Sequence, residues 1–158
     1  MDFLQTLQQS AFSKWVSESG SLLGYPTILF LHTIGLGTVA GLNAGLNLRL
    51  LGFAPGVPLA PLGRLFPAMW LGFAVTALSG LALLVADPVT RLTQVIFYVK
   101  LLFVLLAVVN MQLLWTRVIR PVTLAPGPLP ASARTLALTS LFFWLAATTS
   151  GRLIAYVY

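Results

Sequence analysis

The chain contains no cysteine, a single histidine and only three acidic residues. The lack of cysteine excludes disulfides, iron–sulfur clusters and thiolate metal sites. The three acids, Asp2, Glu18 and Asp87, are too few and too dispersed for paired-carboxylate chemistry within one subunit. We find no hydrolase triad and no phosphate-binding loop, and we assign no catalytic residue. Any metal or cofactor must therefore use histidine, methionine, asparagine, tyrosine or a carboxylate.

Charge is scarce as well. Only 8% of the 158 residues are charged and 58% are hydrophobic, whereas a soluble domain carries about 25% charged residues. This composition predicts an integral membrane protein, with room for one helical bundle and for no separate soluble domain. The net charge of +6 does not indicate a nucleic-acid partner, because the basic residues cluster at the ends of apolar segments, as membrane topology requires.

Four long apolar stretches predict four transmembrane helices joined by short loops. We therefore expect an all-α fold, an integral membrane four-helix up-and-down bundle over residues 21–158. A polar segment, residues 1–20, precedes it and has apolar residues at helical spacing, which predicts an N-terminal amphipathic helix in the membrane interface. The expected spans are residues 22–51, 65–86, 94–115 and 136–158.

The basic residues predict how the bundle lies in the membrane. One end of the expected bundle has no acids and carries Arg49, Arg64, Arg117, Arg120 and Arg134. The other end has all three acids together with Lys14, Arg91, Lys100 and Arg152. By the positive-inside rule the first end is cytoplasmic. We expect a bacterial inner-membrane protein with both termini periplasmic and an outer aromatic belt of Trp15, Tyr25, Tyr98, Tyr156 and Tyr158.

Small residues repeat every four positions on the first two spans. The first ridge is Gly37, Gly41 and Gly45, and the second is Ala68, Gly72, Thr76 and Gly80. Such ridges let helices approach closely. We expect both to pack inside the bundle, with a subunit interface as the alternative, and we expect the chain to form a homo-oligomer in the lipid bilayer.

The only histidine, His32, lies well inside the first span. An ionisable side chain at membrane depth is costly and is a functional-site hypothesis by default. Tyr25 and Asn43 share its helix face, because separations of 7 and 11 residues return close to the same angle. We predict a cofactor-binding face with His32 as the metal or haem ligand. The alternative is that His32 only hydrogen-bonds a neighbouring helix.

Two cations, Lys100 and Arg152, are expected in the same outer half of the membrane as His32. Each alone is consistent with snorkelling to the interface. Together they form a cationic rim suited to the two propionates of haem b, which also needs an axial ligand and an apolar slot. Copper is the alternative cofactor, but Met69 and Met111 are expected in the inner half, away from His32. A chain with no cofactor is the third possibility.

Three segments resemble known membrane proteins: LHTIGLGTVAGLNAGLNLRLLG, RLFPAMWLGFAVTALSGLALL and FYVKLLFVLLAVVNMQLL. They resemble a group of small, mostly uncharacterised bacterial four-helix membrane proteins that is distantly similar to the copper-resistance CopD and the HemJ families. In HemJ-like proteins a first-helix histidine binds haem b, which implies that role for His32, and a third-helix lysine is required, which implies a cofactor or substrate contact for Lys100. The histidine that follows RLFVY in HemJ is missing here, as are the further Met and His residues of CopD.

Three functions follow from these observations. The first is a haem-b-binding membrane protein in electron transfer or redox chemistry, which would meet a redox partner protein. The second is a CopD-like permease for copper or a small solute. The third is a cofactor-free accessory subunit of a larger membrane complex.

Overall fold

The computed structural model describes residues 2–18, 20–125, 127–154 and 156. All regular secondary structure in these residues is helical, which confirms the all-α prediction. The elements are α1 (Asp2–Gln8), α2 (Ala11–Glu18), α3 (Tyr25–Leu50), the 3-10 helix η1 (Ala60–Arg64), α4 (Leu65–Ala86), α5 (Pro88–Thr93), α6 (Val95–Leu114), the π-helical turn η2 (Trp115–Ile119), α7 (Arg120–Leu124) and α8 (Ser132–Leu153).

Three helical segments are long and apolar enough to cross a membrane. They are Tyr25–Leu50 with 26 residues, Ala60–Ala86 with 27 and Val95–Leu124 with 30. At a rise of about 1.5 Å per residue, each exceeds the roughly 30 Å of a hydrocarbon core. These spans agree with a membrane protein. The fourth long helix, α8, has 22 residues but is less apolar, because serine, threonine and arginine interrupt it.

The expected boundaries hold best for α4, which covers residues 65–86 as predicted. The third span is longer than predicted, because a π-helical turn precedes Pro121 and continues the helix into α7. A proline ring clashes with the carbonyl four residues back in a regular α-helix, and the wider turn changes that spacing. Helix α8 begins four residues before the predicted start, since its polar first turn is helical too. The predicted end at Tyr158 lies outside the described residues.

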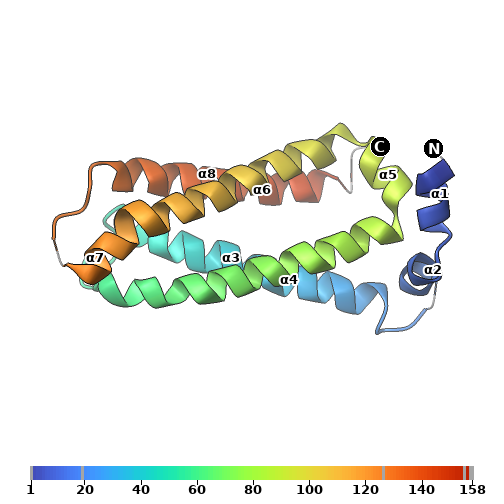
Figure 1. Cartoon of the computed structure of the whole chain (residues 1–158), viewed down its shortest axis with the longest axis horizontal. Coiled ribbons are helices and arrows are strands. Elements are labelled where there is room, and N and C mark those ends of the chain that lie inside the picture. The colour runs from blue at the N-terminus through green and yellow to red at the C-terminus, as the bar shows by residue number, and fades with distance from the viewer. Residues whose placement is uncertain (1, 19, 126, 155, 157–158) are drawn as a thin grey trace.

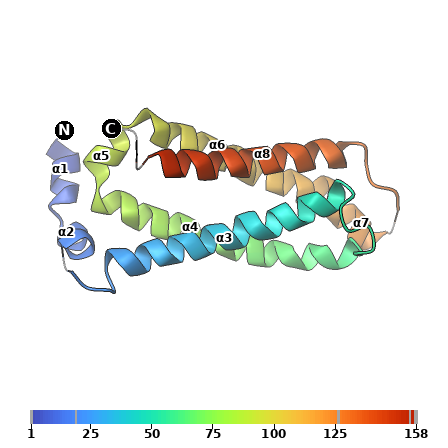
Figure 2. The same ribbon diagram turned by 180° about the vertical axis from the view of Figure 1, so that it is seen from behind.

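The long helices form two antiparallel pairs, α3 with α4 and α6 with α8 (Figure 1). The pairs meet mainly through α3 and α8, while α4 has at most isolated contacts with α6 or α8 among the described residues. Figure 2, seen from behind, shows the same arrangement: the pairs lie close together at the α7 end and separate toward the α5 end. The two ends of the chain also lie at the α5 end.

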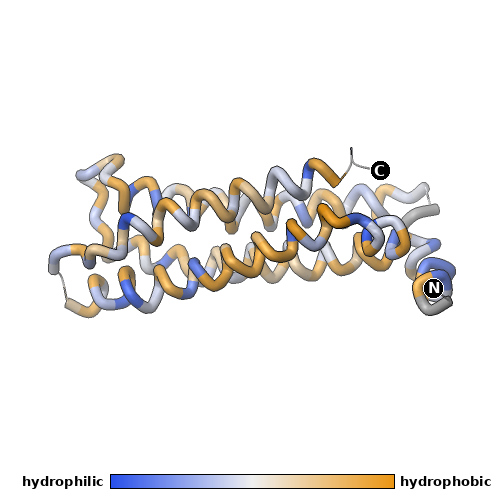
Figure 3. Tube along the Cα trace, turned by 90° about the horizontal axis from the view of Figure 1, so that it is seen from above, coloured by the Kyte–Doolittle hydropathy of each residue, from blue (hydrophilic) through white to orange (hydrophobic). Residues whose placement is uncertain are grey.

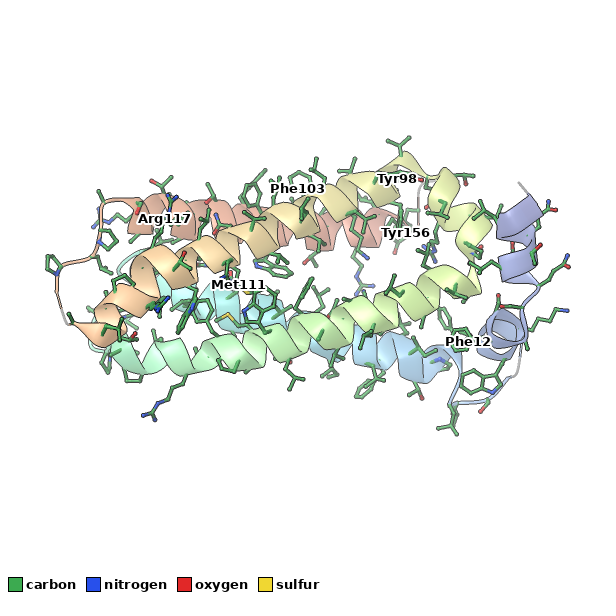
Figure 4. The ribbon with its side chains drawn as sticks, viewed as in Figure 1. Phe12, Tyr98, Phe103, Met111, Arg117 and Tyr156 are labelled. Carbon is green, nitrogen blue, oxygen red and sulfur yellow. The ribbon has the colours of Figure 1, made fainter. Side chains whose placement is uncertain are left out.

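The packed core lies in the half of the molecule near α7. Met69 of α4 and Met111 of α6 are fully buried there, and Met111 projects into the interior (Figure 4). Phe66 stacks against Trp115 with ring centroids 4.8 Å apart. This half therefore holds the two helix pairs together.

Glycines set the contact between α3 and α4. A Cβ at Gly35 would lie 2.8 Å from the backbone oxygen of Gly72, and one at Gly72 would lie 3.0 Å from the backbone oxygen of Gly35. The second predicted ridge thus packs inside the molecule through Gly72. The same prediction is wrong for the first ridge, because a Cβ there would meet no atom within 4 Å. The first ridge, Gly37, Gly41 and Gly45, faces outward.

The N-terminal segment forms two short helices where one amphipathic helix was predicted. The break occurs at Ser10, whose hydroxyl accepts a hydrogen bond from the Ser13 backbone N–H at 3.2 Å and so caps α2. Helix α2 packs on the end of α4, with Ser13 Oγ donating to the Ala86 carbonyl at 3.1 Å and Val16 buried. The rings of Phe12 and Trp15 stay exposed. Figure 3 shows this segment as more hydrophilic than the long helices.

Two tyrosines of the predicted aromatic belt lie at one end of the molecule, and one of the five arginines predicted for the acid-free end lies at the other. Phe12, Tyr98 and Tyr156 lie at the α5 end, and Arg117 lies at the α7 end (Figure 4). Tyr158, expected in the aromatic belt, lies outside the described residues. The two ends of the molecule therefore differ in their side chains.

Candidate functional site

His32 is held against α4 by its ring nitrogen Nδ1. This atom lies 2.9 Å from the Thr76 carbonyl oxygen and 3.2 Å from Ser79 Oγ. A carbonyl only accepts hydrogen bonds, so Nδ1 is the protonated nitrogen. In the neutral ring Nε2 then carries the lone pair. Among the described residues Nε2 has no hydrogen-bond partner, so it remains available to a ligand.

Gly80 makes the space for the imidazole ring. A Cβ at this position would lie 3.1 Å from His32 Cε1 and 3.4 Å from Nδ1. The first distance is shorter than ordinary van der Waals contact, so a larger residue would push the ring away from α4. The glycine and the carbonyl together fix which way the ring faces.

Lys100 of α6 rests on a glycine of α8 in the same manner. A Cβ at Gly151 would lie 3.5 Å from Lys100 Cε and 3.7 Å from Nζ. Its half-buried ammonium group has no hydrogen-bond acceptor or carboxylate partner in the described part of the chain. A cation in such an apolar helix without a counter-charge is a functional-site hypothesis by default.

His32 and Gly151 lie at the same level of the molecule. Ser140 Oγ of α8 donates a hydrogen bond of 2.7 Å to Asn43 Oδ1 of α3, which fixes the register of these antiparallel helices. His32 comes eleven residues before Asn43, and Gly151 comes eleven residues after Ser140. Lys100 lies on Gly151. The structure therefore places His32 and Lys100 at the same level of the molecule, on the two different helix pairs.

Of the other three predicted site residues, Asn43 and Tyr25 lie away from His32 along α3. Asn43 is buried about 16 Å farther along α3, where its Oδ1 also accepts a hydrogen bond of 2.6 Å from Asn47 Nδ2. Tyr25 lies about 10 Å away in the opposite direction and is 43% exposed. Arg152 follows Gly151, and its side chain is exposed with no described partner. The prediction that Tyr25 and Asn43 share a helix face with His32 considered only the angle around the helix. It ignored the distance along the helix axis.

Several residues at the site were not predicted to act there. Thr76, Ser79 and Gly80 hold the His32 ring, and Gly151 supports Lys100. The indole nitrogen of Trp144 is a further candidate, since it is buried without a hydrogen-bond partner about 10 Å inward of Gly151 on α8. The sequence shows Ser79-Gly80 as a hydroxyl beside a glycine, but it does not show that this pair lies opposite His32.

No group of three or more His, Asp or Glu residues that could hold a metal ion occurs in the described part of the chain. Met69 and Met111 are both packed in the core near α7 and are not ligands beside His32. A metal bound at His32 would therefore take most of its ligands from a cofactor.

No protein-family model matches the chain, and no curated protein or solved structure matches it either. The role of the site is therefore argued from its geometry.

Proposed function

We propose that this protein binds haem b through His32 in a membrane and takes part in electron transfer or related redox chemistry. The observation that carries the proposal is the hydrogen bond from His32 Nδ1 to the Thr76 carbonyl. This arrangement is the usual one for a metal-ligating histidine, whose second nitrogen donates to a carbonyl or carboxylate and so fixes tautomer and ring orientation. Haem b would supply the redox-active iron.

The neighbouring residues fit the remaining needs of a haem. Its propionates need cations, and the Lys100 ammonium lies at the level of His32 without a described acceptor. Arg152, exposed on the same turn of α8 as Gly151, is the second cation. The macrocycle also needs apolar surroundings, and α4 has at most isolated contacts with α6 or α8 among the described residues. The buried Trp144 indole N–H, about 10 Å inward of Gly151, is a further donor without a hydrogen-bond partner.

We propose that α8 completes a four-helix transmembrane bundle. Its hydroxyls are less polar than the composition suggests, because Thr139 Oγ1 and Thr148 Oγ1 donate to carbonyls four residues back at 2.9 and 2.8 Å. The α7 end would face the cytoplasm of a bacterial inner membrane, since it carries the five arginines. Helix α2 would lie in the outer interface with Phe12 and Trp15 in the lipid headgroups.

The chain offers one strong axial ligand, so the iron would be five-coordinate or would take its sixth ligand elsewhere. A second copy in a homo-oligomer would be one source of that ligand. The proposal follows the resemblance to haem-binding HemJ proteins. It does not follow the copper passage inferred for CopD, because both central methionines are enclosed in the core.

Absorbance spectra of protein purified from cells able to supply haem test the proposal. Wild type should show a Soret band that His32→Ala loses and Lys100→Ala weakens or shifts. Thr33→Ala is the matched control, because this neighbour on α3 is exposed and bonds only its own helix.

Wild type without haem would remove the proposal and favour a cofactor-free accessory subunit. A full Soret band in His32→Ala would retain haem but refute the axial ligand. A full and unshifted band in Lys100→Ala would refute the propionate contact.

A further inference from the structure

The cytoplasmic-side end of α3 is closed by a turn that folds the next loop back over the helix. The backbone N–H of Gly52 donates to the Arg49 carbonyl at 3.1 Å, and that of Phe53 donates to the Leu48 carbonyl at 3.1 Å. This is a Schellman motif, and Gly52 adopts the φ of +103° that it needs. The turn brings the chain back beside the outward glycines.

Arg49 holds the returning loop in place. Its Nε donates to the Val57 carbonyl at 2.5 Å and its Nη2 donates to the Pro55 carbonyl at 3.0 Å. A guanidinium has five N–H donors, so three remain for another acceptor. The loop held by Arg49 forms a wall beside α3.

The wall and the helix enclose an apolar groove of about 430 Å³. Gly41 and Gly45 form its floor, where no side chain fills the space. Leu48, Phe53, Val57 and Leu62 line its sides. The groove opens on the outward face of α3, which the structure leaves uncovered, and its shape and polarity suit a hydrocarbon chain.

A second cavity of about 510 Å³ adjoins the groove, with Arg49 common to both. Arg134 also lines this second cavity, together with the first residues of α8. The amino-terminal end of a helix carries a partial positive charge and favours phosphate groups. No acid lies nearby, because Asp2, Glu18 and Asp87 belong to the opposite end of the chain's spans. The cavity therefore suits an anion.

We infer that the groove and the cavity together bind one anionic phospholipid of the inner leaflet. Its phosphate would lie between Arg49 and Arg134, and one acyl chain would lie over Gly41 and Gly45. An anionic lipid has an acyl chain for the groove and a phosphate for the cavity. A free phosphate would fill the cavity alone. Anionic lipids are enriched in the cytoplasmic leaflet, and basic pockets between transmembrane helices bind their headgroups. This site is separate from His32 and does not depend on haem.

Native mass spectrometry of the full chain in detergent tests the inference, with three probes: phosphatidylglycerol, phosphatidylcholine with the same acyl chains, and glycerol phosphate. One phosphatidylglycerol should bind per chain, and more tightly than either other probe. A basic residue near the surface contributes about 1 kcal/mol toward anionic lipid, so Arg134→Gln should weaken phosphatidylglycerol about fivefold. Arg120→Gln is the matched control, since Arg120 is exposed at the same end and lines neither cavity.

Gly45→Leu tests the acyl-chain part of the site. An added Cβ at Gly45 meets no described atom within 4 Å, so a leucine would occupy the floor of the groove without a clash at its Cβ. Phosphatidylglycerol should therefore bind more weakly while the protein stays folded. Equal binding of the two lipids, equal loss in Arg120→Gln and Arg134→Gln, or equal affinity for glycerol phosphate would each overturn the inference. So would disulfide cross-linking between copies through Gly45→Cys, because a second chain would then cover the groove.

Discussion

The half of the molecule near α7 and the half near α5 are built from the same four long helices but use them differently. Near α7 the two helix pairs share a core, and the Asn43–Ser140 hydrogen bond joins α3 to α8. Near α5 each pair packs mainly within itself, with His32 held by α4 and Lys100 resting on α8. The packed half gives the fold its register, and that register sets the open half's geometry.

Polar side chains differ between the halves in the same way. In the packed half their partners are other side chains, as in Asn47 to Asn43 and Asn110 Nδ2 to Thr139 Oγ1 at 2.6 Å. In the open half, His32 Nε2 and Lys100 Nζ have no described partner. Buried amides that bond each other stabilise helix contacts, although Asn43 Nδ2, Asn47 Oδ1 and Asn110 Oδ1 are themselves buried without a partner. The unpartnered atoms of the open half differ because they belong to titratable side chains, which are the candidates for binding a ligand. The experiments below distinguish polar side chains that stabilise the fold from polar side chains that would bind a ligand.

The largest effect on stability is expected in the packed half, from Asn43→Ala. The change leaves Asn47 Nδ2 and Ser140 Oγ without their shared acceptor and removes side-chain volume from a fully buried position. We expect a loss of about 3 kcal/mol in the free energy of unfolding. Unfolding in mixed micelles with increasing dodecyl sulfate measures it.

If the two halves differ in this way, His32→Ala without any cofactor should lower the free energy of unfolding by less than about 1 kcal/mol. An equal loss in both variants would mean that His32 is a structural residue and that the two halves do not differ.

A smaller loss is expected from Gly35→Ala on the packed face of α3. The added Cβ would meet the Gly72 carbonyl oxygen and the Thr76 backbone nitrogen at 2.8 Å, so the helices must move apart. Overpacking of this kind costs about 2 kcal/mol. Gly37→Ala, two residues later on the outward face of α3, should change the free energy of unfolding by less than about 0.5 kcal/mol. The same unfolding assay decides, and equal losses would place both glycines in helix contacts.

The pair Gly35 and Gly37 also shows how far the sequence predicts this fold. Hydropathy predicted four membrane spans, of which three are helices long and apolar enough to cross a membrane, and α4 agrees with its predicted bounds at both ends. The repeat of Gly37, Gly41 and Gly45 predicted the packing face of α3, yet the contact uses Gly35, which stands outside the repeat. A four-residue period identifies a smooth helix face, but the partner that meets it depends on the rotation of each helix, which is a tertiary property.

The site was predictable to a similar extent. His32 and Lys100 were selected from residue type and depth, and the structure places them at one level. Asn43 and Tyr25 were grouped with His32 by angle alone, although distance along the helix separates them. The supporting contacts from Gly80 and Gly151 could not be read from the sequence, since they depend on the register between helices. That register is set by side-chain bonds such as Asn43–Ser140.

The smallest stability effect, and the sharpest test of the open half, is expected from Gly80→Ala. Its Cβ would meet only the His32 ring, at 3.1 Å from Cε1, and a side chain can turn away more cheaply than a backbone can move. Stability should therefore fall by less than in Gly35→Ala, while the ring loses its orientation.

The chain has one histidine, so its Cε1–H nuclear magnetic resonance signal is unique and should shift in Gly80→Ala. Gly151→Ala is the control, because its Cβ would meet Lys100 at ordinary contact distances of 3.5 to 3.7 Å and should leave that signal in place. If His32 is the haem ligand, Gly80→Ala should also shift or weaken the Soret band. A histidine signal that Gly80→Ala does not move would show that the Thr76 carbonyl alone positions the ring, and that the glycine is not part of the site.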